Sequence, residues 1–194
     1  TYSILTMMSE DGSQLWNIDF SYWQVPGDCL LARPLYCDDS NIYLNAMCEV
    51  SNLPYQTVQP GFVDYRNALI KTDLTGQIEW SSIFGIEFGL SWSNASFSES
   101  SIYLIGSLFE QIPGTNDPYT NPDAGMARFD SDGNFKWVKQ FTCYPDDCTI
   151  NPYASFLDHN QNIWIGGTTN GPLPGQVNNG NFDMFLIQYH PNSF

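Results

Sequence analysis

Few residues in this chain have the types and spacing that metal binding or catalysis requires. The run Asp130-Ser131-Asp132-Gly133-Asn134 places oxygen ligands at alternate positions, as a calcium loop does. The glutamate that completes an EF-hand loop does not follow at the required distance. The run is therefore interpreted first as a turn, and Asp130, Asp132 and Asn134 are kept as the calcium candidates.

The remaining acid and base groups do not form a catalytic constellation. The pairs Asp38-Asp39 and Asp146-Asp147 would suit glycoside hydrolysis only at the right separation, and both lie in predicted turns. His159 and His190 stand apart in turns of their own. No Gly-x-Ser-x-Gly elbow or phosphate loop is present. The sequence predicts no catalytic residue, no cofactor and no enzymatic activity.

The five cysteines predict disulfides and not a zinc site, because no CxxC or Cys/His spacing occurs. Cys143 and Cys148 bracket a turn-forming Tyr-Pro-Asp-Asp, which predicts a short loop disulfide. If the stretches 29–37 and 41–48 form a hairpin, Cys29 lies near Cys48, and Cys37 with Cys48 is the competing pair.

Disulfides favour an exported, oxidising setting, and the alternative is a cytosolic protein with reduced core cysteines. The sequon Asn94-Ala95-Ser96 makes Asn94 a candidate glycosylation site and also fits export. The chain begins with Thr1 and not with Met, which favours a processed protein or a segment of a longer one. We expect an extracellular or cell-surface location.

Composition excludes several classes of partner. The 194 residues include 21 acidic and only 6 basic residues, for a formal net charge of −15. This charge repels phosphate backbones and anionic membrane surfaces, so nucleic acid is excluded as a partner. No apolar run reaches the roughly 18 residues of a membrane span. An aromatic content of 15% argues against disorder.

The elements that would position any site belong to a module of roughly sixty residues. One half of the module recurs at residues 41–44, 101–104 and 162–165. The other half is an Asp-x-x-Gly turn followed by a tryptophan, as in Asp73 to Trp80 and Asp130 to Trp137, with a degenerate copy from Ser9 to Trp16. Repeats of this kind are typical of propellers, solenoids and arrays.

Each module predicts four strands, since apolar residues alternate between turn-forming residues. In the best copy these strands are Leu90–Phe97, Ile102–Leu108, Gly125–Phe129 and Asn134–Gln140. The turn aspartate bonds its own backbone two residues on, and the glycine adopts the positive φ that closes the hairpin. The tryptophan then covers a neighbouring sheet.

The predicted fold is all-β, a propeller-like array of four-stranded antiparallel units in a single domain, 1–194. Its units are a partial one at 1–20, full ones at 28–85 and 90–141, and a partial one at 151–194, about three and a quarter in total. Open sheet edges are rarely left exposed. The array is therefore either part of a larger propeller, completed by another copy, or an open stack.

Long loops at 49–65, 109–123 and 169–182 join the second and third strands of each unit. Loops of this length in a compact repeat are usually functional. Their aromatic residues are candidates for contact with protein or sugar, and alternatively pack their own loops. These candidates are Tyr55, Tyr65, Tyr119 and Phe182, with Tyr153 nearby.

The segments 41–44, 67–80, 123–137 and 181–185 resemble the bacterial beta-propeller repeat of the SBBP type. The resemblance implies a secreted or surface-exposed scaffold within a large protein, without a shared catalytic residue. Asn45 and Ala46 stand where that repeat has a glycine, and the long loops and cysteines depart from it. The turn also resembles the sialidase Asp-box and the quinoprotein repeat, but each differs by one residue in spacing.

We therefore expect a non-enzymatic extracellular scaffold that acts by protein–protein contact or self-assembly. Strand complementation between copies would build filaments, with other copies or the rest of a longer chain as partner. The alternative function is a carbohydrate-binding or glycan-processing propeller domain. A quinoprotein-type dehydrogenase fragment is the third hypothesis.

Overall fold

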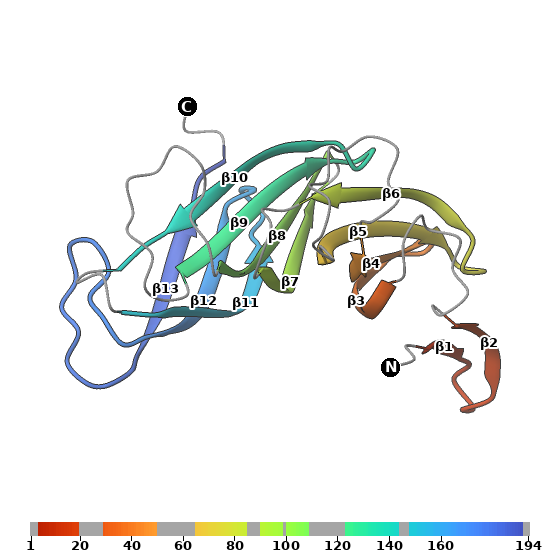
Figure 1. The fold of residues 1–194 in the computed structure, drawn as a ribbon, viewed down its shortest axis with the longest axis horizontal. Coiled ribbons are helices and arrows are strands. Elements are labelled where there is room, and N and C mark those ends of the chain that lie inside the picture. The colour runs from red at the N-terminus through yellow and green to blue at the C-terminus, as the bar shows by residue number, and fades with distance from the viewer. Residues whose placement is uncertain are drawn as a thin grey trace. The chain divides into compact units, whose positions relative to one another are not determined.

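The computed structural model describes residues 4–19, 29–49, 65–84, 90–98, 100–108, 123–143 and 148–191. These residues form thirteen strands and no helix, and every strand pairing is antiparallel. The chain divides into two compact units, 1–88 and 89–194. Figure 1 shows the strands of each unit.

The first unit contains a hairpin and a four-stranded sheet. The hairpin is β1 (Ile4–Met8) with β2 (Gln14–Asp19), and the sheet runs β3 (Cys29–Cys37), β4 (Asn41–Glu49), β5 (Tyr65–Asp73), β6 (Ile78–Phe84). Alternate residues of β4 and β5 form the core of this unit, because successive side chains point to opposite faces. Trp16 of β2 packs against that core, which comprises Ile42, Leu44, Ala46, Ala68 and Ile70.

The second unit packs two sheets face to face. The first sheet runs β7 (Leu90–Ser98), β8 (Ser101–Leu108), β9 (Asp123–Asp130), β10 (Phe135–Phe141). The second runs β11 (Ile150–Leu157), β12 (Ile163–Thr169), β13 (Asp183–Tyr189). Figure 1 shows the green and cyan strands of the first sheet against the blue strands of the second. Their shared core contains Tyr103, Ile105, Met126, Ile163 and Ile165.

A polar seam joins the first strands of these two sheets. Ser96 Oγ on β7 donates to Ser155 Oγ on β11 at 2.9 Å. Ser155 Oγ in turn donates to Asn94 Oδ1 at 3.0 Å, and Asn94 Nδ2 donates to the Tyr153 carbonyl at 3.5 Å. The seam fixes β7 beside β11, so the two sheets meet at their first strands as well as across their faces.

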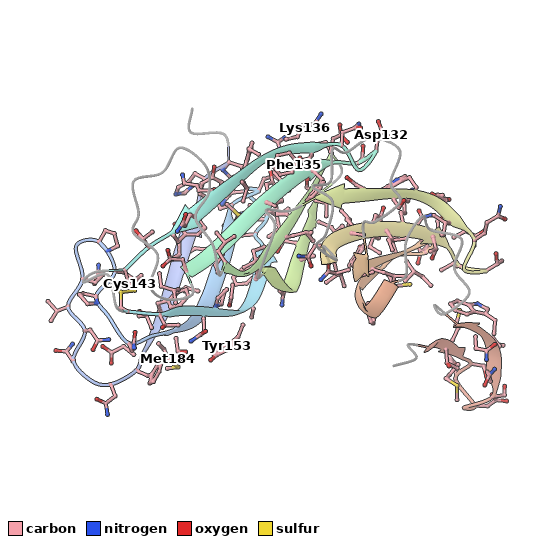
Figure 2. All side chains as sticks on the ribbon, viewed as in Figure 1. Asp132, Phe135, Lys136, Cys143, Tyr153 and Met184 are labelled. Carbon is pink, nitrogen blue, oxygen red and sulfur yellow. A yellow bond between two sulfur atoms is a disulfide. The ribbon has the colours of Figure 1, made fainter. Side chains whose placement is uncertain are left out.

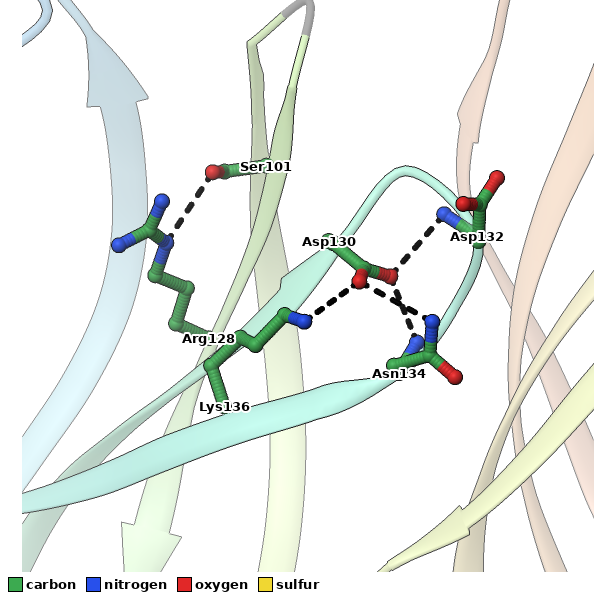
Figure 3. A network of polar contacts seen from close by, with 6 residues as sticks. All are labelled: Ser101, Arg128, Asp130, Asp132, Asn134 and Lys136. Atoms are coloured by element: carbon green, nitrogen blue, oxygen red, sulfur yellow. Dashed lines mark hydrogen bonds and ion pairs between the residues drawn. The ribbon is translucent and has the colours of Figure 1, made fainter.

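The turn chemistry predicted from the sequence is confirmed. Asp130 Oδ1 accepts the backbone N–H groups of Asp132 at 3.1 Å and Asn134 at 2.8 Å, as Figure 3 shows. Asp73 and Asp158 bond the amides two and four residues on in the same way. The fourth turn position has positive φ in all three copies of the repeat turn, with Gly12 at 82°, Gly76 at 86° and Gly133 at 81°. Gln161 of the β11–β12 turn has φ of 64° at the same position.

A β-bulge precedes the tryptophan in each strand that follows a repeat turn, namely β2, β6 and β10. Trp16 lies opposite Met7, Trp80 opposite Lys71 and Trp137 opposite Arg128. In each pair of strands the register shifts just before the tryptophan, at Leu15, Glu79 and Lys136. A bulge of this kind re-aims the side chain that follows it. The bulge is therefore part of the repeat.

The all-β fold and the four-stranded antiparallel units are as predicted, and strand ends differ from expectation by one or two residues. The propeller arrangement and the single domain stay predictions. Within the described residues, no helix has the length and hydropathy needed to span a membrane.

Cys143 and Cys148 form the predicted disulfide, with 6.0 Å between their Cα atoms. Cys29 lies directly opposite Cys48 in the β3–β4 register, but the two side chains lie outside the described residues. Cys37 lies opposite Ile42 and carries a free, exposed thiol. The register therefore brings Cys29, and not Cys37, opposite Cys48.

Candidate functional site

A row of three side chains crosses each four-stranded sheet. In the second unit, Tyr103 of β8 lies opposite Arg128 of β9, which lies opposite Trp137 of β10. The Trp137 ring is 6.3 Å from the Tyr103 ring, and the Arg128 guanidinium lies 5.9 Å from the Tyr103 centroid. Such aromatic and cation–π pairs stabilise neighbouring strands.

The same row occurs in the first unit. Tyr43 of β4 lies opposite Lys71 of β5, which lies opposite Trp80 of β6. The Trp80 and Tyr43 rings are 6.3 Å apart, and Lys71 Nζ lies 5.9 Å from the Tyr43 centroid. Both four-stranded sheets thus carry an aromatic residue, a cation and a tryptophan side by side on their second, third and fourth strands.

The β11–β13 sheet contains only the first two positions of this row. Trp164 of β12 lies opposite Gln188 of β13. Among the described residues, no strand pairs with the other edge of β13, where a tryptophan would follow. Trp164 instead stacks on Phe156 with a centroid distance of 6.1 Å and an interplanar angle of 6°.

One face of this sheet is exposed, and we call it the open face: Phe156, Trp164, Met184, Leu186 and Gln188. Met184 is 90% and Leu186 62% exposed, and Figure 2 shows Met184 and the exposed Tyr153 projecting away from the ribbon. Exposed apolar groups gathered on one sheet face are typical of an interaction surface.

The matching face of the β7–β10 sheet is covered. Ala124 and Met126 occupy the register positions of Met184 and Leu186, and both are 0% exposed. They are buried because the β11–β13 sheet packs on that face. The open face of the β11–β13 sheet therefore corresponds to the face of the β7–β10 sheet that is buried.

A groove runs along the free edge of β13. Its volume is about 1100 Å³. It is lined by the end of β10 with Thr142 just after it, by the loop residues 171–174 and 176–179, and by residues 183–188 of β13. Amide side chains alternate there with apolar ones, among them Gln140, Phe141, Asn178 and Phe185. Six residues of strand span about 20 Å, so the groove follows a full strand length.

The calcium candidates take part in the hydrogen bonds of their own turn. Asp130 Oδ2 accepts from Asn134 Nδ2 at 3.0 Å and from Lys136 Nζ at 2.6 Å, while Oδ1 accepts two backbone amides (Figure 3). Lys136, followed by Asn134, holds the pKa of Asp130 well below its usual range. Both carboxylate oxygens of Asp130 thus have protein donors. Calcium binding stays a prediction.

Asp158 forms a turn of the same kind between β11 and β12, with a different side-chain partner. Trp164 Nε1 donates to Asp158 Oδ2 at 3.0 Å, and this bond is the main reason that the pKa of Asp158 lies well below its usual range. Since Trp164 belongs to the open face, the turn also fixes the orientation of its indole ring. No group of three or more His, Cys, Asp or Glu among the described residues could hold a metal ion.

The other predicted site residues do not come together. Tyr55 and Tyr119, and the side chain of Tyr65, lie outside the described residues. Phe182 is exposed at the end of the 169–182 loop, just before β13. Asn94 lies in the polar seam, where its amide nitrogen contacts β11, and its glycosylation stays a prediction.

Sequence reasoning missed the row across the sheets and the open face. The signal was present, since Tyr43, Tyr103 and Trp164 recur at one module position. The cross-strand register that joins them to Lys71 and Arg128 comes only from the structure.

No family model and no curated protein matches this sequence. The resemblance to the SBBP-type repeat therefore depends on the quoted residues alone.

Proposed function

We propose that this chain is a non-enzymatic extracellular scaffold that acts by protein–protein contact, through the free edge of β13 and the open face beside it. The observation that carries the proposal is the exposure of Met184 and Leu186 next to a strand edge that no described strand pairs with. Strand addition at such an edge gives main-chain hydrogen bonds and directional assembly. The partner is another copy of this chain or the rest of a longer one.

Further observations support this proposal. The repeated turns and rows build a rigid β framework, and the sheets are proposed to follow one another as propeller-like units. The SBBP-type resemblance favours a surface scaffold, and the Cys143–Cys148 disulfide favours an oxidising setting. Asp130 and Asp158 have strongly lowered pKa values because of hydrogen bonds within or beside their own turns.

Sedimentation of the purified chain over a wide concentration range tests self-association. We expect reversible association that Leu186→Asp weakens by more than tenfold, because a charge on the open face opposes apolar contact. Leu15→Asp is the matched control, since Leu15 is 58% exposed on the β1–β2 hairpin. A chain that stays strictly monomeric at high concentration would overturn assembly with itself.

Carbohydrate binding is the second candidate function. The exposed rings of Tyr153 and Phe156 on β11 favour it, and so do the amides of the groove along β13, since sugars bind by stacking and by amide hydrogen bonds. The Tyr153 hydroxyl also lies 3.2 Å from Thr168 Oγ1, which holds that ring on the sheet. Glycan-array binding that Tyr153→Ala abolishes and Tyr36→Ala retains would support this function. An array without any bound glycan would exclude it.

A further inference from the structure

The same sequence pattern follows each of the three repeat turns. Trp16 is followed four residues later by Phe20, Trp80 by Phe84 and Trp137 by Phe141. Residues four apart in a strand point to the same face, and in β10 both Trp137 and Phe141 lie within the strand. In β10 the Trp137 and Phe141 rings lie 5.9 Å and 6.5 Å from the Tyr189 ring of β13. The Trp-x-x-x-Phe pattern thus presents two aromatic anchors on one face.

The register states where these anchors would fall on β13. Trp137 lies opposite Arg128 and Phe141 opposite Ala124. In the repeat, Gln188 of β13 has the position of Arg128, and Met184 has the position of Ala124. A strand added in the same register would place its tryptophan beside Trp164 and its phenylalanine over Met184. The most exposed apolar side chain of the open face would then be covered.

Charge favours a basic version of this strand. The chain carries a net charge of −15 with only six basic residues, and two of them, Lys136 and Lys139, lie on β10. Lys139 Nζ is 4.8 Å from the Tyr189 ring, so one of these cations already lies near β13. Opposite charges raise the rate of association and oppose wrong partners.

We propose that the groove beside β13 binds an extended Trp-x-x-x-Phe segment, which adds antiparallel to β13 as its fourth strand. The occupant is a peptide segment of the type of β10, which carries Lys136 and Lys139, with its tryptophan opposite Gln188. The inference rests on the proposed function and specifies its partner. The groove of about 1100 Å³ exceeds the usual small-molecule site and extends along the strand edge, as a peptide requires.

A synthetic peptide with the sequence of residues 134–142, labelled with a fluorophore, tests this binding by anisotropy against the whole chain. We expect saturable binding that a Trp137→Ala change in the peptide weakens by more than tenfold. The control peptide exchanges Trp137 with Val138 and so keeps composition and charge. Because a shift by one residue moves a side chain to the other face, this control is also expected to bind more than tenfold more weakly.

Variants of the receptor locate the bound peptide. Leu186→Asp is expected to weaken binding more than tenfold, and Leu15→Asp to leave it unchanged. Both leucines are exposed, so neither change should unfold the protein. If the exchanged peptide binds as tightly as the native sequence, the inference is overturned.

Cross-linking tests the register. Lys139 lies opposite Met126, which corresponds to Leu186 on β13. In a Cys37→Ser background, a peptide carrying Lys139→Cys should form a disulfide with Leu186→Cys in preference to Met184→Cys. Directly opposed Cα atoms lie about 5 Å apart, whereas a pair displaced by two residues is too distant. Preference for Met184→Cys would overturn the assigned register.

The outcomes separate this inference from the proposed function. A chain that associates with itself but does not distinguish the native from the exchanged peptide contradicts the inference alone. A monomeric chain that binds the native peptide selectively supports the inference and excludes self-assembly. A chain that neither associates nor binds any of the peptides contradicts both.

Discussion

The two sheets of the second unit have the same repeat but differ in what covers them. Ala124 and Met126 of β9 are buried under β11–β13, whereas Met184 and Leu186 of β13 are exposed at matching positions. The β9 edge is paired with β10, whereas no described strand pairs with the far edge of β13. The difference shows that a neighbouring sheet, and not the repeat itself, decides whether a position is core or surface.

The largest expected effect comes from truncating the apolar side chains at the matching positions of the two faces. Met126→Ala should lower the free energy of unfolding by about 3 kcal/mol, because it removes buried atoms and leaves a cavity. Leu186→Ala should change it by less than about 0.5 kcal/mol. Urea denaturation at low protein concentration measures both. Equal losses would show that Leu186 is buried in solution.

Two adjacent glycines of β12 sharpen the comparison, since they point to opposite faces. A Cβ at Gly167 would lie 2.1 Å from the Asn151 carbonyl oxygen and 2.8 Å from the Phe185 ring. At Gly166, on the open face, the nearest atoms are 3.9 Å away. Gly167→Ala should therefore destabilise the protein by about 2 to 3 kcal/mol through overpacking.

Gly166→Ala should be neutral or stabilising by about 0.5 kcal/mol, because alanine loses less entropy than glycine on folding. Thermal unfolding of the two variants and the wild type measures the difference in sign. A loss of stability in Gly166→Ala as large as that in Gly167→Ala would mean that both faces of β12 are covered.

Much of this fold was predictable from the sequence because the repeat marks its own turns. Asp73, Asp130 and the glycines that follow them predicted hairpins whose geometry the structure reproduces. The row from Tyr103 through Arg128 to Trp137 was not predictable, since it depends on register between strands about 25 residues apart. The exposure of Leu186 was equally hidden, because its module position is buried in β9.

The hairpin turns of the two sheets give the next comparison. Gly133 has φ of 81° in the β9–β10 turn, and Gln161 has φ of 64° at the same position of the β11–β12 turn. Gly133→Ala should cost about 1 kcal/mol, because a side chain is strained at positive φ. Gln161→Gly should stay within about 0.5 kcal/mol of wild type, since relief of strain is offset by greater unfolded-state entropy.

Guanidinium denaturation of these two variants measures both changes. Gly175→Ala, at φ of 77° in the 169–182 loop, is a control for positive φ outside a hairpin. A stabilising Gly133→Ala would contradict the turn geometry.

The smallest effect is the pH dependence of the two turn carboxylates. The folded-state pKa values of Asp130 and Asp158 lie below the unfolded value of about 3.9. Their stabilisation is therefore complete above about pH 5 and is lost as the pH falls through the folded-state values. Asp130→Asn and Asp158→Asn should each be less stable than wild type at pH 7, and the gap should narrow toward pH 2. Asp132→Asn is the control, since Asp132 contributes only its backbone amide to the network in Figure 3.

Salt should separate the two turns, because their strongest partners differ. Asp130 pairs with the charged Lys136, whereas Asp158 accepts from the neutral indole of Trp164. Screening weakens exposed ion pairs and leaves neutral hydrogen bonds nearly unchanged. In thermal melts at pH 7, high salt should therefore reduce the loss of stability caused by Asp130→Asn more than that caused by Asp158→Asn. An equal response would mean that Lys136 adds little to the β9–β10 turn, and that the backbone amide hydrogen bonds stabilise both turns alike.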